Sequence, residues 1–142
     1  MATLREQILA RALVALTGTT PAGANVFRSR EASITRAMTP AIVLMPQGEQ
    51  DDRYGQSTDH HQFTIEVAIF SRGDPWDQIA DGVAEAVHRV LIADAGLQAL
   101  ATDVRKVSTS YESEEADRTA GTLGSVYRIT YLSKSSDIAA AP

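Results

Sequence analysis

Apolar residues recur at two spacings along the chain, and each spacing predicts one type of secondary structure. Within residues 3–17, leucine, isoleucine and alanine return every three or four positions, which is the period of one face of a helix. Thr3 and Glu6 have the spacing of a capping box, and Gly18 provides a stop. The pattern therefore predicts an N-terminal helix over about residues 3–17.

A second helical period follows Asp74 and Pro75. Asp74 is a suitable N-cap, and Pro75 suits the first helical position because its missing N–H is not needed there. Apolar residues then follow at spacings of three and four and form one broad stripe, which we expect to pack on a sheet. Its members are Trp76, Ile79, Ala80, Val83, Val87, Val90 and Leu91.

Other stretches have the patterns of β-strands. A short strand is expected within residues 25–30, and the continuous apolar run at residues 41–45 is typical of a strand covered on both faces. Residues 61–70 alternate strictly, and this is the clearest strand of the chain. Its inward face carries Phe63, Ile65, Val67 and Ile69.

The last two expected strands form a hairpin. One covers residues 104–111, and the inward face of the other is marked by Tyr127, Ile129 and Tyr131. A long acidic connection joins them.

The intervening segments have weaker patterns. Residues 31–40 are expected to be irregular chain or a short helix, and residues 94–103 break the second helix. The polar, glycine-punctuated residues 46–58 indicate a long loop or a mobile hairpin arm. These elements predict an α+β two-layer sandwich with a mostly antiparallel or mixed sheet of about five strands and two main helices on one face. We expect one domain over residues 1–142, with a flexible tail at about residues 134–142.

Composition and charge narrow the class of function. The chain has 13 basic and 18 acidic residues and no visible basic stripe, so direct nucleic-acid binding is disfavoured. The absence of cysteine removes disulfides and thiolate nucleophiles, and it fits a reducing cytoplasm. No apolar run approaches the length of about 18 residues that a membrane span needs, so we expect a soluble protein.

Four carboxylates lie close together near the last hairpin, at Glu112, Glu114, Glu115 and Asp117. A catalytic carboxylate pair needs one acid with its pKa raised by an apolar pocket. These acids have no aromatic wall beside them in the sequence, and charge runs are usually solvated. We therefore interpret them as the exposed tip of a hairpin.

Other candidate chemistry is weaker still. His60 and His61 are neighbours at the start of a strand, so their side chains should point to opposite faces and not share a metal. No nucleophile elbow, phosphate-binding loop or dinucleotide fingerprint is present. We expect no catalytic residues, no metal and no cofactor.

The order of several motifs resembles a known family. An alternating strand ends in RGDP, an amphipathic helix ends in AD, LATDVR and an acidic ExxEADR stretch follow, and a tyrosine-rich strand closes the series. Over about residues 58–132 this series resembles the tail terminator proteins of long-tailed bacteriophages, of the lambda minor tail protein U type. Membership of a divergent counterpart of this family, from a gene transfer agent or a myophage, stays open as an alternative.

The resemblance implies a structural virion protein that forms a hexameric ring. Such a ring caps the head-proximal end of the tail tube in the virion and ends tube polymerisation. Its partners are the major tail tube protein and the head-completion protein. Assembly takes place in the host cytoplasm, and DNA may pass through the lumen of the ring. Residues of the two polar loops are then the candidates for contacts with neighbouring subunits or with the tube. These residues are Asp51, Asp52, Arg53, Tyr54, Glu112, Glu114, Glu115, Asp117 and Arg118. The alternatives are a head–tail connector or tail-tube subunit, and, in another class, a small ligand-binding domain or hydrolase.

Overall fold

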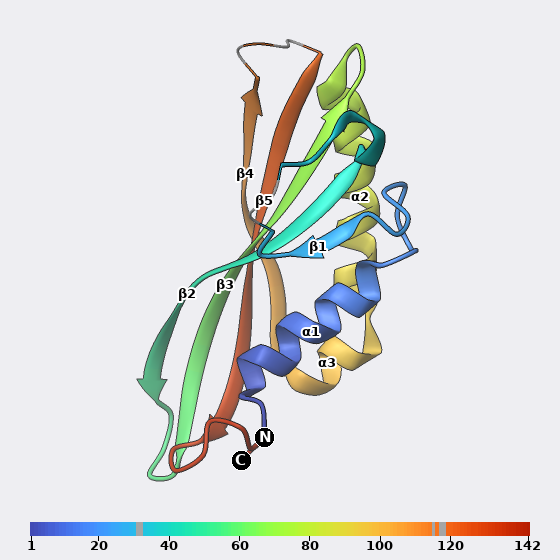
Figure 1. The fold of residues 1–142 in the computed structure, drawn as a ribbon. Coiled ribbons are helices and arrows are strands. Elements are labelled where there is room, and N and C mark those ends of the chain that lie inside the picture. Colours follow the sequence, from blue (N-terminus) through green and yellow to red (C-terminus); the bar gives the residue numbers. More distant parts are fainter. Residues whose placement is uncertain (31–32, 115, 117–118) are drawn as a thin grey trace.

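A five-stranded sheet with helices on one face forms the fold (Figure 1). The computed structural model describes residues 1–30, 33–114, 116 and 119–142. The helices of this part are α1 (Leu4–Leu16), the short 3₁₀ helix η1 (Arg36–Met38), α2 (Trp76–Ala93) and α3 (Ala95–Leu100). The strands are β1 (Val26–Arg28), β2 (Ala41–Arg53), β3 (Thr58–Arg72), β4 (Asp103–Ser113) and β5 (Ala120–Lys134). The predicted α+β sandwich is confirmed.

The sheet is mixed, with strand order β1-β2-β3-β5-β4. β1 runs parallel to β2, and every other neighbouring pair is antiparallel. The turn between β2 and β3 lies beside Lys134 at one end of β5, whereas β4 joins β5 near Ala120 at the other end. The two long hairpins therefore extend from opposite ends of the sheet (Figure 1).

The core lies between the helices and one face of the sheet. The predicted inward residues of β3 and β5 are buried there, with Ile65, Val67 and Ile69 at 0% exposure. Helix α2 buries Val83 and Val87 against them, and α1 adds residues such as Ile8. The alternating and helical patterns therefore identified the packed faces correctly, although Ile79 of the predicted α2 stripe is 40% exposed.

The start of α2 differs from the prediction. Pro75 has an extended backbone and serves as the N-cap, so the helix begins at Trp76. Asp74 was expected to cap the helix, but it lies one residue too early, and the first turn has no side-chain cap. Asp77 is the acidic residue of the first turn, near the positive end of the helix dipole.

Residues 46–53 are also different, because they continue β2 and are not a loop. Their backbones pair with β3 from Gly48 opposite Thr64 to Arg53 opposite Asp59, and a register shift between Pro46 and Gly48 accommodates the proline. Only residues 54–57 connect the two strands. The alternative of a hairpin arm is thus correct and the long loop is wrong, while the mobility of the arm stays a prediction.

The segment after β5 turns back toward the N-terminus. The Leu4 N–H donates to the Ile138 carbonyl at 2.9 Å, and the Lys134 N–H donates to the Ala140 carbonyl at 3.0 Å. The two termini accordingly lie near each other (Figure 1). The looseness of this tail, like the single-domain boundary, stays a prediction. Among the described residues, the helices are all too short or too polar to cross a membrane.

Candidate functional site

The β2–β3 tip is one of the two surfaces that carry the predicted interface residues. Asp51, Asp52 and Arg53 end β2 and are exposed, and Tyr54 begins the turn with 68% of its surface exposed. Arg53 donates to the Gln56 carbonyl at 3.0 Å, which closes the turn. The tip therefore presents an aromatic ring and charged side chains to solvent.

The β4–β5 tip lies at the opposite end of the sheet. Glu112 is within β4 and Glu114 follows it, and both are exposed as expected. The Glu114 N–H donates to the Ala120 carbonyl at 3.1 Å. Three further predicted residues, Glu115, Asp117 and Arg118, lie outside the described residues. The structure thus separates the described candidates into two groups and does not bring these two groups together.

A polar cluster directly behind the β2–β3 tip was not predicted. We call it the hairpin-base cluster, and it joins β2, β3, β5 and α1. Its members are Arg5, Glu49, Asp51, His61, Tyr131 and Ser133. His61 and Ser133 are buried, and the Glu49 side chain is 9% exposed, so each needs a partner inside the protein.

Glu49 is at the centre of this cluster. Its carboxylate accepts a hydrogen bond from the Tyr131 hydroxyl and one from Arg5 Nη1 at 3.0 Å. Burial raises the pKa of Glu49, and a hydrogen bond to Asp51 raises it further. Hydrogen bonding with Glu49, followed by that with His61, lowers the pKa of Asp51. The neighbouring carboxyls thus hold protons unequally, which limits repulsion between them.

His61 of β3 contacts both neighbouring strands, β2 and β5. Its Nδ1 lies 2.6 Å from Asp51 Oδ1, and its Nε2 lies 2.7 Å from Ser133 Oγ. Its ring stacks on Tyr131 with centroids 4.5 Å apart. Because both ring nitrogens and the ring face are engaged, the imidazole is held in one orientation between β2 and β5. His60 and His61 do differ in burial, as their expected opposite faces require.

Glu49, Asp51 and His61 could in principle ligate a metal, since they place one ligand atom each within 4.8 Å of the others. However, Arg5 already brings a positive charge to 3.0 Å from Glu49 Oε2. A divalent cation there would face the repulsion of that guanidinium. The geometry therefore favours a cluster that connects α1 to the hairpin.

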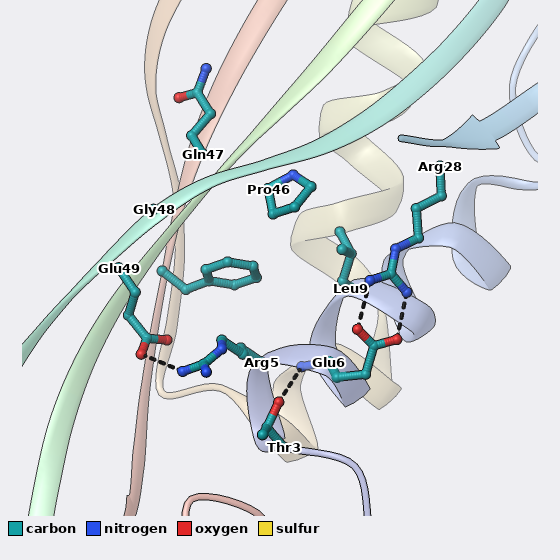
Figure 2. Close-up of a pocket in the computed structure, with 10 residues that line it drawn as sticks. Thr3, Arg5, Glu6, Leu9, Arg28, Pro46, Gln47, Gly48 and Glu49 are labelled. Atoms are coloured by element: carbon teal, nitrogen blue, oxygen red, sulfur yellow. Dashed lines mark hydrogen bonds and ion pairs between the residues drawn. The ribbon is translucent and has the colours of Figure 1, made fainter. Parts of the chain in front are cut away.

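A cavity of about 370 Å³ lies beside the cluster, between the start of α1 and the strands β1 and β2. Figure 2 shows that two ion pairs border it, Arg5 with Glu49 and Arg28 with Glu6. The Arg28–Glu6 pair is bidentate, at 2.5 and 2.6 Å. Since its charged groups are already paired, the cavity offers a ligand little polar recognition, and its main feature is the attachment of α1 to the sheet.

The sequence contained a signal for part of this cluster. His61 has the same parity as Phe63 and Ile65, and so belongs to the buried face, where a histidine needs partners. Tyr131 also lies on the buried face of its strand, and its hydroxyl needs a hydrogen-bond partner there. The identity of the partners follows only from strand pairing, which places Asp51 directly opposite His61, and His61 opposite Tyr131.

A protein-family model matches nearly the whole chain. The family model described as phage minor tail protein U matches residues 2–131. No curated protein matches the chain. A chain of a solved structure titled "Virion of native gene transfer agent (GTA) particle" is 15% identical and covers 92% of each chain, with a TM-score of 0.48.

Proposed function

The chain belongs to the phage minor tail protein U family, and from this premise we propose that it is a tail terminator. The family makes it a structural protein of a phage tail. In the proposal, six copies close into a ring at the head-proximal end of the tail tube. The ring ends polymerisation of the major tail tube protein and joins the tube to the head-completion protein.

The observation that carries this proposal is the position of the two hairpin tips at opposite ends of one sheet (Figure 1). A ring whose axis runs along the strands would present one tip on each of its two faces. Asp52 and Tyr54 would then lie on one face, and Glu112 and Glu114 on the other. A joint between two different partners needs two such surfaces.

The hairpin-base cluster supports the same proposal. It ties the β2–β3 arm to α1 through Arg5 and Glu49, so the exposed tip is supported from behind. A supported surface loses less conformational entropy on binding than a loose loop does. Its charged residues suit the selection of a partner and of a register more than they suit raw affinity.

The proposal also states where the protein lies and what passes through the ring. Assembly takes place in the host cytoplasm, and the finished ring lies at the head–tail junction of the virion. DNA passes through its lumen without sequence-specific contacts. No catalytic step is involved.

Deletion of the gene distinguishes this role from its rivals, with particles viewed by electron microscopy. Loss of a terminator leaves tubes of uncontrolled length that do not join heads. Loss of a connector leaves tails of normal length beside unattached heads, and loss of a tube subunit leaves no tails. Tails of normal length in the deletion phage contradict the terminator role.

The β2–β3 tip is tested by complementing the deletion with Asp52→Arg combined with Tyr54→Ala. Both side chains are exposed, so the subunit should fold and form rings, while tail length or head joining fails. Asp51 is left unchanged because it contacts His61. The control is Asp81→Arg combined with Ile92→Ala, two exposed positions on α2. Normal particles from the tip variant would reject this tip as a contact surface.

A further inference from the structure

We infer that neighbouring subunits join by β-strand pairing, with β4 of one subunit adding to the free outer edge of β2 in the next. This inference rests on the proposed ring and names the surface that closes it. The partner is a second copy of the chain, and the contact is made largely by backbone hydrogen bonds, as in other cases of strand addition.

One half of the surface is the outer edge of β4. This strand pairs only with β5, and within the described chain no strand lies beyond it. Ten of its eleven residues are exposed, with Val104 the exception. Tyr111 is 57% exposed. A strand that is open on its edge and exposed on both faces is a ready template for another strand.

The other half is the outer edge of β2. The short strand β1 covers β2 only from Ile42 to Leu44, and the Ser29 N–H donates to the Leu44 carbonyl just beyond. Among the residues that the structure describes, β2 pairs from Met45 to Arg53 with β3 alone, on its inner side. Each subunit therefore carries two unequal open edges, one at each side of the sheet.

The directions of the strands suit pairing of these two edges around a ring. Because β2–β3, β3–β5 and β5–β4 are all antiparallel, β4 runs opposite to β2. Rotation about an axis along the strands preserves these directions. β4 of one subunit would then meet β2 of the next in antiparallel orientation, so the alternation would continue through the joint.

The side chains divide each edge into protected and open parts. On β4, Arg105 and Lys106 precede a register shift, and charges with bulges discourage unwanted pairing. The following residues, Ser108 to Tyr111, are uncharged and regularly paired with β5. On β2 the outer edge carries the acidic Asp51 near its end, and the charge of Asp51 is opposite to that of Arg105 and Lys106.

This arrangement also explains why the contact would close into a ring and not a pair. An interface between two different edges is heterologous, and such interfaces form rings when the rotation closes. The competing arrangement is β4 pairing with β4 of a second copy, which is isologous and stops at a dimer. The two arrangements predict different cross-links.

Disulfide cross-linking tests the inference, because the chain has no cysteine of its own. Single cysteines are placed at Gln50 or Asp52 on β2, and at Ser108 or Ser110 on β4, all of which are exposed. Two positions on each strand sample the stagger that tilted strands acquire in a closed ring. Within one chain, β3 and β5 separate β2 from β4 by about 14 Å, beyond the reach of a disulfide.

The expected result is a β2–β4 cross-link between chains. Purified rings and assembled tails that carry one cysteine on each strand, such as Gln50→Cys with Ser108→Cys, should give a ladder of covalent oligomers up to the size of the ring after mild oxidation. In rings formed from a mixture of the two single-cysteine variants, cross-linking should stop at dimers that contain one chain of each variant.

Two other results overturn the inference in different ways. Rings of the expected mass with no β2–β4 cross-link at any of the four pairs, or with dimers from a β4 cysteine alone, reject this surface and leave the ring standing. A subunit that is monomeric in every tail preparation rejects the ring as well.

A lysine on the open edge gives an independent readout. Ser110→Lys introduces a charge among the uncharged residues of β4, and it should reduce the ring fraction at least tenfold in native mass spectrometry while the melting temperature of the subunit changes little. Gln78→Lys adds the same charge at an exposed position of α2 and should leave rings intact. Equal ring fractions for the two variants contradict pairing through this edge.

Discussion

Trp76 and Gly121 show how one pair of residues sets the spacing between a helix and the sheet. Trp76 opens α2, and its ring lies on β5 where Gly121 has no side chain. A Cβ at Gly121 would be 2.4 Å from two ring carbons of Trp76. The glycine is therefore a requirement of close packing, and its backbone conformation is not the reason for it.

We predict that Gly121→Ala destabilises the subunit by about 1–3 kcal/mol, because the rigid indole must move away from β5. Gly82→Ala is the matched control. Its added methyl group meets nothing within 4 Å, and alanine favours the helix, so stability should rise by about 0.5–1 kcal/mol. Urea unfolding followed by the fluorescence of Trp76, the one tryptophan, measures both changes. Equal stability of Gly121→Ala and the native chain would contradict the packing argument.

At the scale of elements, Asp94 joins α1 to α3. It is the N-cap of α3, where it accepts a hydrogen bond from the Leu97 N–H at 2.9 Å, and it receives two hydrogen bonds from Arg11 of α1 at 2.7 and 2.8 Å. The hydrogen bonds from Arg11 are the main reason that the pKa of Asp94 lies below its ordinary value. One carboxylate thus starts a short helix and holds it beside another.

Asp94→Ala should lower the free energy of unfolding by about 0.5–2 kcal/mol at neutral pH through loss of the cap alone. Since the folded-state pKa of Asp94 is lowered, its contribution is complete above the unfolded pKa of about 3.9, and it is lost as the pH falls through the folded value. The difference between the native chain and the variant should therefore shrink in acid. Urea titrations from pH 7 to pH 3 measure it, with the exposed Asp81→Ala as control. A difference that stays constant over this range would show that ionisation of Asp94 is not involved.

At the scale of the whole molecule, stability and proposed function occupy different places. The core lies under the helices, where the inward residues of β3 and β5 are buried. The two tips are at the ends of the sheet and carry exposed charges. Changes at the tips should therefore affect assembly far more than folding.

Glu112→Gln combined with Glu114→Gln tests this separation at the β4–β5 tip. Both residues are exposed, so stability should change by less than about 0.5 kcal/mol. Joining of tails to heads, or control of tail length, should be impaired in a complemented deletion phage seen by electron microscopy. A loss of several degrees in melting temperature would show instead that these acids are structurally paired.

The sequence by itself determined which faces are packed. Tyr127, Ile129 and Tyr131 were assigned to the inward face of their strand, and each is at most 1% exposed. The helix over residues 3–17 was likewise placed to within one residue of α1 at each end. These features are local, because burial of one face imposes a period of two or 3.6 on the residues themselves.

Only the tertiary structure decided the rest. Residues 46–53 are a strand because their backbone groups pair with β3, and side chains of polar residues do not record that pairing. Glu49 and Tyr131 are 82 positions apart, and they meet because β3 lies between β2 and β5. The hairpin-base cluster and the two open edges of the sheet depend on strand order and register. These are properties of contacts between distant segments, which no local period contains.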